Sequence, residues 1–184
     1  MIQYLAILAA PFLNLPTIRR IRRNHGLEHA TIHLLSRQVK NLSMAGRSIA
    51  SGFYLYGNVS TEEIEKAVHE ALDRMRNGEH RLAIHPNCGT GLVTAGIMSG
   101  LATLVGTTGM KQGVMERLAR FPTIVLLSTF SLIVSQPLGL AFQQHFTTLG
   151  EPGDLAVVNI TRSEFPIPLG GQRLTVHFVR TTGG

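Results

Sequence analysis

Three side chains capable of metal binding and acid–base chemistry stand close together at His25, Glu28 and His29. Two imidazoles four residues apart share one face of an α-helix, so both can reach a single metal ion. The carboxylate beside them can hold or deprotonate a metal-bound water. The His-x-x-Glu-His pattern therefore predicts metal ligands at His25 and His29 and a catalytic base at Glu28.

A second group of candidate ligands follows at His85 and Cys88, separated by the turn residues Pro86 and Asn87. A turn between a histidine and a cysteine three residues apart directs both side chains toward one point. Cys88 is the only cysteine, so the chain cannot form an internal disulfide. Both groups together predict a site for Zn²⁺ or another divalent transition metal, with the ligands His25, His29, His85 and Cys88.

Three functions are compatible with these residues. Three protein ligands and an open position for water would make a metal-dependent hydrolase at a membrane surface, whereas four ligands would make a structural staple without catalysis. The third alternative is a metal-free membrane scaffold or assembly protein. In that case Glu28 pairs with an arginine such as Arg22 or Arg47, and the histidines hydrogen-bond to the backbone, because buried polar groups must be satisfied.

The elements that would position these groups can be read from periodicity. Pro16 opens a helical pattern that runs to about Lys40. Its inward stripe is Ile18, Ile21, His25, Glu28, His29, Ile32, Leu35 and Val39. A short strand is expected at residues 53–56, a capping box at Ser60 opens a helix that ends near Gly78, and residues 81–85 are expected to be extended. Residues 155–161 and 173–179 are expected to form strands that pair as a hairpin or add edges to a small sheet.

Two long uncharged runs predict membrane-spanning helices at about residues 88–109 and 121–144. Each run would make a helix of about 36 Å, enough to cross a hydrocarbon core of about 30 Å. The first run carries small residues at four-residue spacing, Gly91, Ala95 and Ser99 with Gly96 and Gly100 offset by one, which favours close helix contacts and self-association into a homo-oligomer. Buried helices of a soluble protein are the alternative.

Positive charge is concentrated just after an apolar stretch at residues 1–13, in Arg19, Arg20, Arg22 and Arg23, and the net charge is +6. This arrangement favours a membrane-surface helix with its arginines among anionic headgroups, and nucleic acid is not expected as a partner because no aromatic residues are interleaved with the arginines. The loop between the spans is also basic. Under the positive-inside rule we expect both termini and the extramembrane parts in the cytoplasm of a cell-membrane protein.

The predicted fold class is therefore an α+β membrane protein, a two-helix transmembrane hairpin with a small helical and β extramembrane domain. The expected parts are an amino-terminal extramembrane domain with an interfacial helix at 1–85, the hairpin at 86–146, and a carboxy-terminal β segment at 147–184. The bilayer is the expected partner.

Three segments also carry a resemblance to a known family: RNHGLEHATIHLL at 23–35, residues 52–57, and AIHPNCGTG at 83–91. They resemble a family of bacterial membrane proteins classified as domain of unknown function 6391. More distantly, HGLEH and HPNCGT are similar to segments of the YqhQ-like predicted metal-dependent membrane enzymes. That resemblance implies a role for His25, Glu28, His29, His85 and Cys88 in a metal site. Ala30 stands where the YqhQ-like pattern has a lysine, so any role of a cation there is not implied.

Overall fold

The computed structural model describes residues 2–111, 113–166 and 173–184, and the chain divides into two compact units. The first, here called the sheet unit, comprises Met1–His85 and Gln144–Gly184. The second, the helix-pair unit, comprises Pro86–Gln143.

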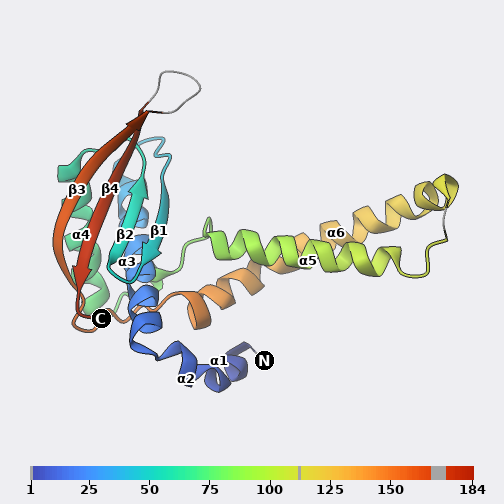
Figure 1. The fold of residues 1–184 in the computed structure, drawn as a ribbon, viewed down its shortest axis with the longest axis horizontal. Helices are drawn as coiled ribbons and strands as arrows, with labels where there is room; N and C mark the ends of the chain where they lie inside the picture. Colours follow the sequence, from blue (N-terminus) through green and yellow to red (C-terminus); the bar gives the residue numbers. More distant parts are fainter. Residues whose placement is uncertain (1, 112, 167–172) are drawn as a thin grey trace. The chain divides into compact units, whose positions relative to one another are not determined.

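The sheet unit is built on four antiparallel strands in the order β1-β2-β4-β3 (Figure 1). Their bounds are Ala45–Ile49 for β1, Gly52–Tyr56 for β2, Ala156–Pro166 for β3 and Arg173–Thr182 for β4. Strand β4 lies in the interior of the sheet, where Phe53 of β2 faces Val179 and Leu55 faces His177. The carboxy-terminal strands therefore complete the sheet begun by the amino-terminal ones, and the predicted α+β class is confirmed.

Two helices cover one face of this sheet, α3 at Pro16–Gln38 and α4 at Thr61–Arg76 (Figure 1). Helix α4 begins with the predicted capping box, in which Ser60 and Glu63 each bond the other's backbone N–H. Its apolar stripe packs with those of α3 and the strands into one core, whose fully buried members include Leu27, Leu35 and Phe53. Hydrophobic burial between helices and sheet holds the unit together.

Helix α3 is more deeply buried than an amphipathic surface helix. Every residue from Gly26 to Ile32 is buried, so its middle is enclosed on all sides and not only along the predicted stripe. Asn24 fixes it to the sheet: its amide donates to the carbonyls of Ile49 and Ala50, and its oxygen accepts from Thr181.

The arginines that open α3 differ from the expectation that they lie among lipid headgroups. Arg22 is 7% exposed and donates to the carbonyls of Leu13, His145 and Thr148. Arg20 donates to the carbonyl of Thr181. These guanidiniums satisfy backbone carbonyls within the sheet unit. A buried carbonyl needs a hydrogen-bond donor, and each arginine side chain supplies five N–H donors.

Two short helices precede α3, α1 at Ile2–Leu8 and α2 at Ala10–Leu13. Large apolar side chains on them are exposed, among them Tyr4 at 74% and Leu8 at 78%. Farther along, residues 81–83 of the expected extended segment instead belong to the 3-10 helix η1 at His80–Ala83, and Ile84 after it is extended. The prediction for 81–83 was wrong because this short turn has no periodicity to reveal it.

The helix-pair unit consists of α5 at Gly89–Thr107 and α6 at Val114–Phe142, followed by a π-turn at Gln143–Thr147. Helix α6 begins seven residues before the expected span, with a Glu116–Arg120 ion pair of 3.4 Å in its first turns. The helices approach closely at small residues: a Cβ added to Gly139 would lie 3.0 Å from the Cα of Gly91. At Gly96 and Gly100 an added Cβ would meet nothing within 4 Å, so this part of the small-residue ridge is not used between α5 and α6.

Within the described residues, two helices are long and apolar enough to cross a membrane, Gly89–Thr107 and Val114–Thr147. Of their most apolar windows, 11% and 17% of the residues are buried. The apolar side chains of these helices are therefore mostly exposed.

Candidate metal centre

His25 and His29 lie on one face of α3, as their spacing predicted. Their ring centroids are 4.4 Å apart, with an angle of 62° between the ring planes. One ligand nitrogen of each lies within 4.8 Å of the other. His29 is 3% exposed and His25 is half-buried. Two imidazoles at this separation can bind one ion, since two zinc–nitrogen bonds of about 2.0–2.1 Å can bridge nitrogens up to about 4 Å apart after a small side-chain adjustment.

Backbone carbonyls fix the tautomer of both rings. The Nδ1 atom of His25 lies 2.9 Å from the carbonyl oxygen of Thr147, and that of His29 lies 2.8 Å from the carbonyl oxygen of Ala83. Because a carbonyl only accepts, each Nδ1 is assigned as the donor, which leaves Nε2 as the atom that could bind a metal. A metal-binding histidine commonly has this arrangement, with its second nitrogen donating to a carbonyl.

Glu28 faces strand β1 and not an arginine. Its Oε2 accepts a hydrogen bond of 2.5 Å from the Ser48 hydroxyl, and the side chain is 3% exposed. The carboxylate also packs on Gly46, where an added Cβ would lie 2.7 Å from Glu28 Cγ. Burial raises the pKa of the Glu28 carboxyl above its ordinary value, and the Ser48 hydrogen bond and the His25 charge oppose that rise. The salt bridge to Arg22 or Arg47 considered above is absent among the described ion pairs.

His85 follows η1 and lies against α3. Its ring centroid is 5.8 Å from that of His29 and 5.0 Å from that of His33. Burial, followed by the charges of His29 and His33, lowers the pKa of His85 to about 4. A neutral ring at pH near 7 is the form that binds metals. The structure thus brings His85 to the histidine cluster, with its ring nearer to that of His33 than to that of His29.

Cys88 caps the amino terminus of α5, where its Sγ accepts from the backbone N–H of Thr90 at 3.4 Å. It belongs to the helix-pair unit, three residues after His85. Chain geometry alone keeps the Cα atoms of these two residues within about 11 Å of each other.

The comparisons with known proteins give this chain a family. A model described as Domain of unknown function (DUF6391) matches residues 20–160. The chain belongs to this family. It is also similar to an uncharacterised protein of the cyanobacterium Picosynechococcus, with 33% identity over 142 residues. The match covers 70% of this chain and 65% of that relative, so it spans slightly less than two thirds of the relative's length.

No solved structure matches this DUF6391 chain. The matched residues include all the predicted ligands, but neither the family description nor the relative's name states an activity. The similarity to YqhQ-like proteins stays a prediction.

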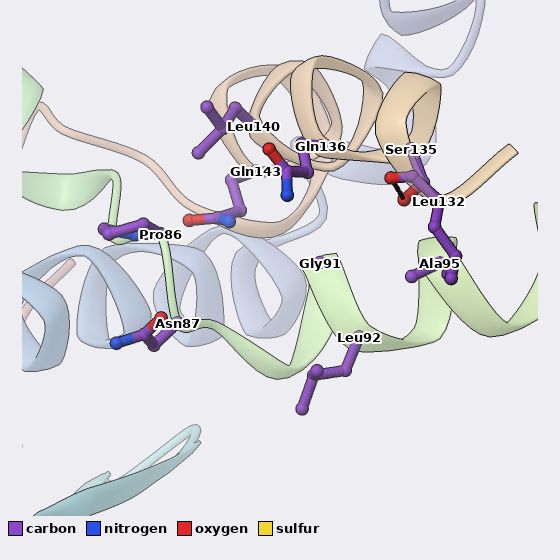
Figure 2. Close-up of a pocket in the computed structure, with 10 residues that line it drawn as sticks. All are labelled: Pro86, Asn87, Gly91, Leu92, Ala95, Leu132, Ser135, Gln136, Leu140 and Gln143. Atoms are coloured by element: carbon purple, nitrogen blue, oxygen red, sulfur yellow. Dashed lines mark hydrogen bonds between the residues drawn. The ribbon is translucent and has the colours of Figure 1, made fainter. Parts of the chain in front are cut away.

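A pocket of about 460 Å³ lies in the helix-pair unit of this DUF6391 chain, between the start of α5 and the last third of α6 (Figure 2). Figure 2 shows the carboxamides of Asn87, Gln136 and Gln143 together with leucine side chains along its wall. Its described lining includes neither a histidine nor a carboxylate, so this pocket offers no side chains typical of acid–base or metal chemistry.

Sequence reasoning missed several residues that shape the site. Ser48 and Gly46 lie twenty residues or fewer from Glu28 in the chain, and only the pairing of β1 with β2 brings them under α3. Gly26 had a signal, because a glycine in mid-helix indicates close backbone approach. A Cβ added there would lie 2.5 Å from the carbonyl oxygen of Leu149.

Proposed function

We propose that this chain is a membrane-anchored metalloprotein that binds Zn²⁺ or another divalent transition metal and uses it for hydrolysis. His25, His29 and Cys88 are the proposed ligands, because imidazole and thiolate are side-chain types that bind such an ion. Glu28 is the proposed general base, and the bilayer is the proposed partner of the helix pair.

The observation that carries the proposal is the geometry of the two imidazoles. The half-buried His25 and the buried His29 lie on one face of α3, and the Nδ1 of each lies within hydrogen-bond distance of a backbone carbonyl, so Nε2 is the proposed ligand atom of each ring. Two imidazoles with ring centroids 4.4 Å apart are close enough for a shared metal ion to bind both.

Cys88 is the proposed third ligand, on the argument of chain connectivity. It follows His85 by three residues, and the His85 ring lies beside His29. A thiolate prefers zinc over hard cations such as Mg²⁺. His85 is the alternative third ligand or, together with Cys88, completes a set of four.

Glu28 would act as the base because it is the carboxyl group next to the histidines in the chain, and because burial raises its pKa above the ordinary value of a carboxyl group. A bound metal would lower the pKa of a coordinated water, and Glu28 would accept its proton. This role requires the carboxylate to leave or share its bond with Ser48.

Membrane attachment is supported by exposed apolar surface in each unit. Along α5 and α6 the exposed side chains include Leu92, Leu104, Leu126 and Ile133, each more than half exposed. Soluble monomers rarely expose contiguous apolar patches of this extent. We propose that α5 and α6 span the cell membrane, that α1 and α2 lie at its surface, and that the sheet unit is cytoplasmic. Self-association through small-residue helix faces stays a prediction.

A closed structural site is the second candidate, and the Ser48–Glu28 hydrogen bond favours it. A carboxylate held by a hydroxyl on β1, and packed on Gly46, already has a structural role. In this version His25, His29, His85 and Cys88 all bind the metal, and no position is left for water.

Cobalt substitution of the full chain in detergent micelles tests both candidates without knowledge of the substrate. Cobalt bound by a thiolate gives a sulfur-to-metal charge-transfer band, and an open site with a bound water gives a visible spectrum that changes as the water ionises. We expect one cobalt per chain, a charge-transfer band lost in Cys88→Ser, and a pH-dependent spectrum.

The control is His69→Ala, which removes an exposed histidine of α4 and should change nothing. A spectrum independent of pH would support the staple over the hydrolase. Full cobalt occupancy in His29→Ala would contradict both forms of the metal proposal.

A further inference from the structure

A separate pocket of the sheet unit lies beside η1 and next to the histidine cluster. Its volume is about 450 Å³. The lining residues are His33, Arg37, Gly78, Glu79, His80, Arg81 and Leu82. Two guanidiniums and two imidazoles therefore face one concave surface together with a single carboxylate.

That carboxylate is paired with an arginine outside the lining. Glu79 accepts hydrogen bonds from Arg74 at 2.9 Å and 2.6 Å, one on each oxygen. Within the part of the chain that the structure describes, neither Arg37 nor Arg81 takes part in an ion pair. Arg74 also pairs with Glu70, so the charged residues of the lining and these two partners together carry one net positive charge, which an anionic ligand would compensate.

His33 connects this pocket to the candidate metal centre. Its ring centroid is 5.0 Å from that of His85, which in turn lies beside His29. The Nδ1 atom of His33 is buried and has no hydrogen-bond partner among the described residues. A rotation of the His33 ring would let this nitrogen donate to an oxygen of a ligand in the pocket, and a buried polar atom without a partner favours such a bond.

We propose that this pocket binds a phosphate-type oxyanion, which is the anionic group of the substrate of the neighbouring metal centre. The Arg37 and Arg81 guanidiniums present paired N–H donors that match phosphate oxygens, and His33 adds a third donor. The assignment of substrate class rests on the proposed function, whereas the binding of the oxyanion itself does not.

The experiment measures binding of radiolabelled inorganic phosphate to the full chain in detergent micelles by equilibrium dialysis, after treatment with a chelator to remove metal. We expect saturable binding at millimolar phosphate. Arg37→Gln and Arg81→Gln should each weaken it roughly tenfold, the loss typical of one charge-assisted contact. Added sodium chloride should weaken binding further, since exposed charges are screened.

Arg180→Gln is the matched control, because Arg180 is an exposed arginine of β4 that does not line the pocket. It removes the same charge and should leave phosphate affinity unchanged. Both pocket arginines are exposed, so their variants should fold, and far-UV circular dichroism checks this. Absence of phosphate binding, or equal weakening in all three variants, would overturn the proposal.

Competition experiments distinguish the two kinds of molecule that could carry the phosphate group, a soluble phosphoester and a phospholipid headgroup. Displacement of the label by glycerol phosphate, but not by nanodiscs that contain phosphatidic acid, assigns a soluble phosphoester. Displacement by phosphatidic acid and not by phosphatidylcholine assigns a lipid headgroup. If neither glycerol phosphate nor phosphatidic acid displaces phosphate, the proposed substrate class is contradicted.

Metal analysis of the same preparations keeps this inference distinct from the proposed function. If the chain binds metal but no phosphate, the metal centre is supported and the phosphate pocket is contradicted. If it binds phosphate in an arginine-dependent manner but never binds metal, the phosphate pocket is supported and the proposed hydrolase is contradicted.

Discussion

Replacing Gly46 by alanine tests how Glu28 is held beneath α3. The new methyl group would overlap the Glu28 carboxyl group and lie 2.7 Å from its Cγ, so the side chain must leave β1 and give up its bond to Ser48. A hydrogen bond to a carboxyl group contributes about 1–3 kcal/mol, and overpacking costs about 1–3 kcal/mol. We expect a destabilisation of about 3 kcal/mol.

For a chain of this size that cost corresponds to a decrease in Tm of about 6–12 °C. Thermal unfolding in detergent, followed by far-UV circular dichroism, measures it. The control is the same substitution in a Glu28→Ala background, where the methyl group finds space. Gly46 does not have the positive φ that would penalise alanine, so there Gly46→Ala should be neutral or stabilise by about 0.4–1 kcal/mol.

The effect of Gly46→Ala on Tm is therefore expected to be a decrease in the native background and no change or an increase in the Glu28→Ala background. Equal decreases in Tm with and without the Glu28 side chain would refute the contact between the carboxyl group and β1. The cycle is informative because each residue contacts the other directly.

Three further predictions concern other parts of the chain. Asn24→Ala removes three hydrogen bonds to the sheet unit: two from its amide to backbone carbonyls, and one from a threonine hydroxyl to its oxygen. It should lower Tm by an amount equivalent to about 2–4 kcal/mol of unfolding free energy, whereas a change below about 0.5 kcal/mol would contradict the anchoring role of Asn24. Burial lowers the pKa of His177, so its neutral ring stabilises the fold fully above the unfolded pKa of about 6.5, and this contribution is lost as pH falls through the folded pKa. Acidification should therefore lower the Tm of the native chain more than that of His177→Gln. Parallel plots of Tm against pH for the two proteins would contradict this prediction. Gly139→Val should separate α5 from α6 and lower Tm, whereas Gly96→Val, at an open position, should not, and the reverse order would contradict the packing described.

Local patterns predicted the elements well. The periodicity after Pro16 predicted α3, and the Ser60 capping box with Asn77 and Gly78 predicted both ends of α4. Each of these signals lies within a few consecutive residues, so it can be recognised without knowledge of the fold. The two apolar runs predicted α5 and α6 for the same reason.

Long-range pairing could not be predicted. β4 lies in the interior of the sheet because Leu55 pairs with His177, more than a hundred residues away, and spacing carries no information about that register. The Ser48–Glu28 bond and the approach of His85 to His33 follow from the same tertiary arrangement. The shared face of His25 and His29 was predictable because one helix sets it.

X-ray absorption spectroscopy of the zinc-loaded full chain tests the metal centre most directly. The account predicts two nitrogen scatterers at about 2.0–2.1 Å, one sulfur at about 2.3 Å, and a light atom in the remaining position. The nitrogen shell should diminish in His25→Ala, and the sulfur should disappear in Cys88→Ser. A spectrum with oxygen ligands alone, or one that neither substitution alters, would contradict a zinc centre on these residues.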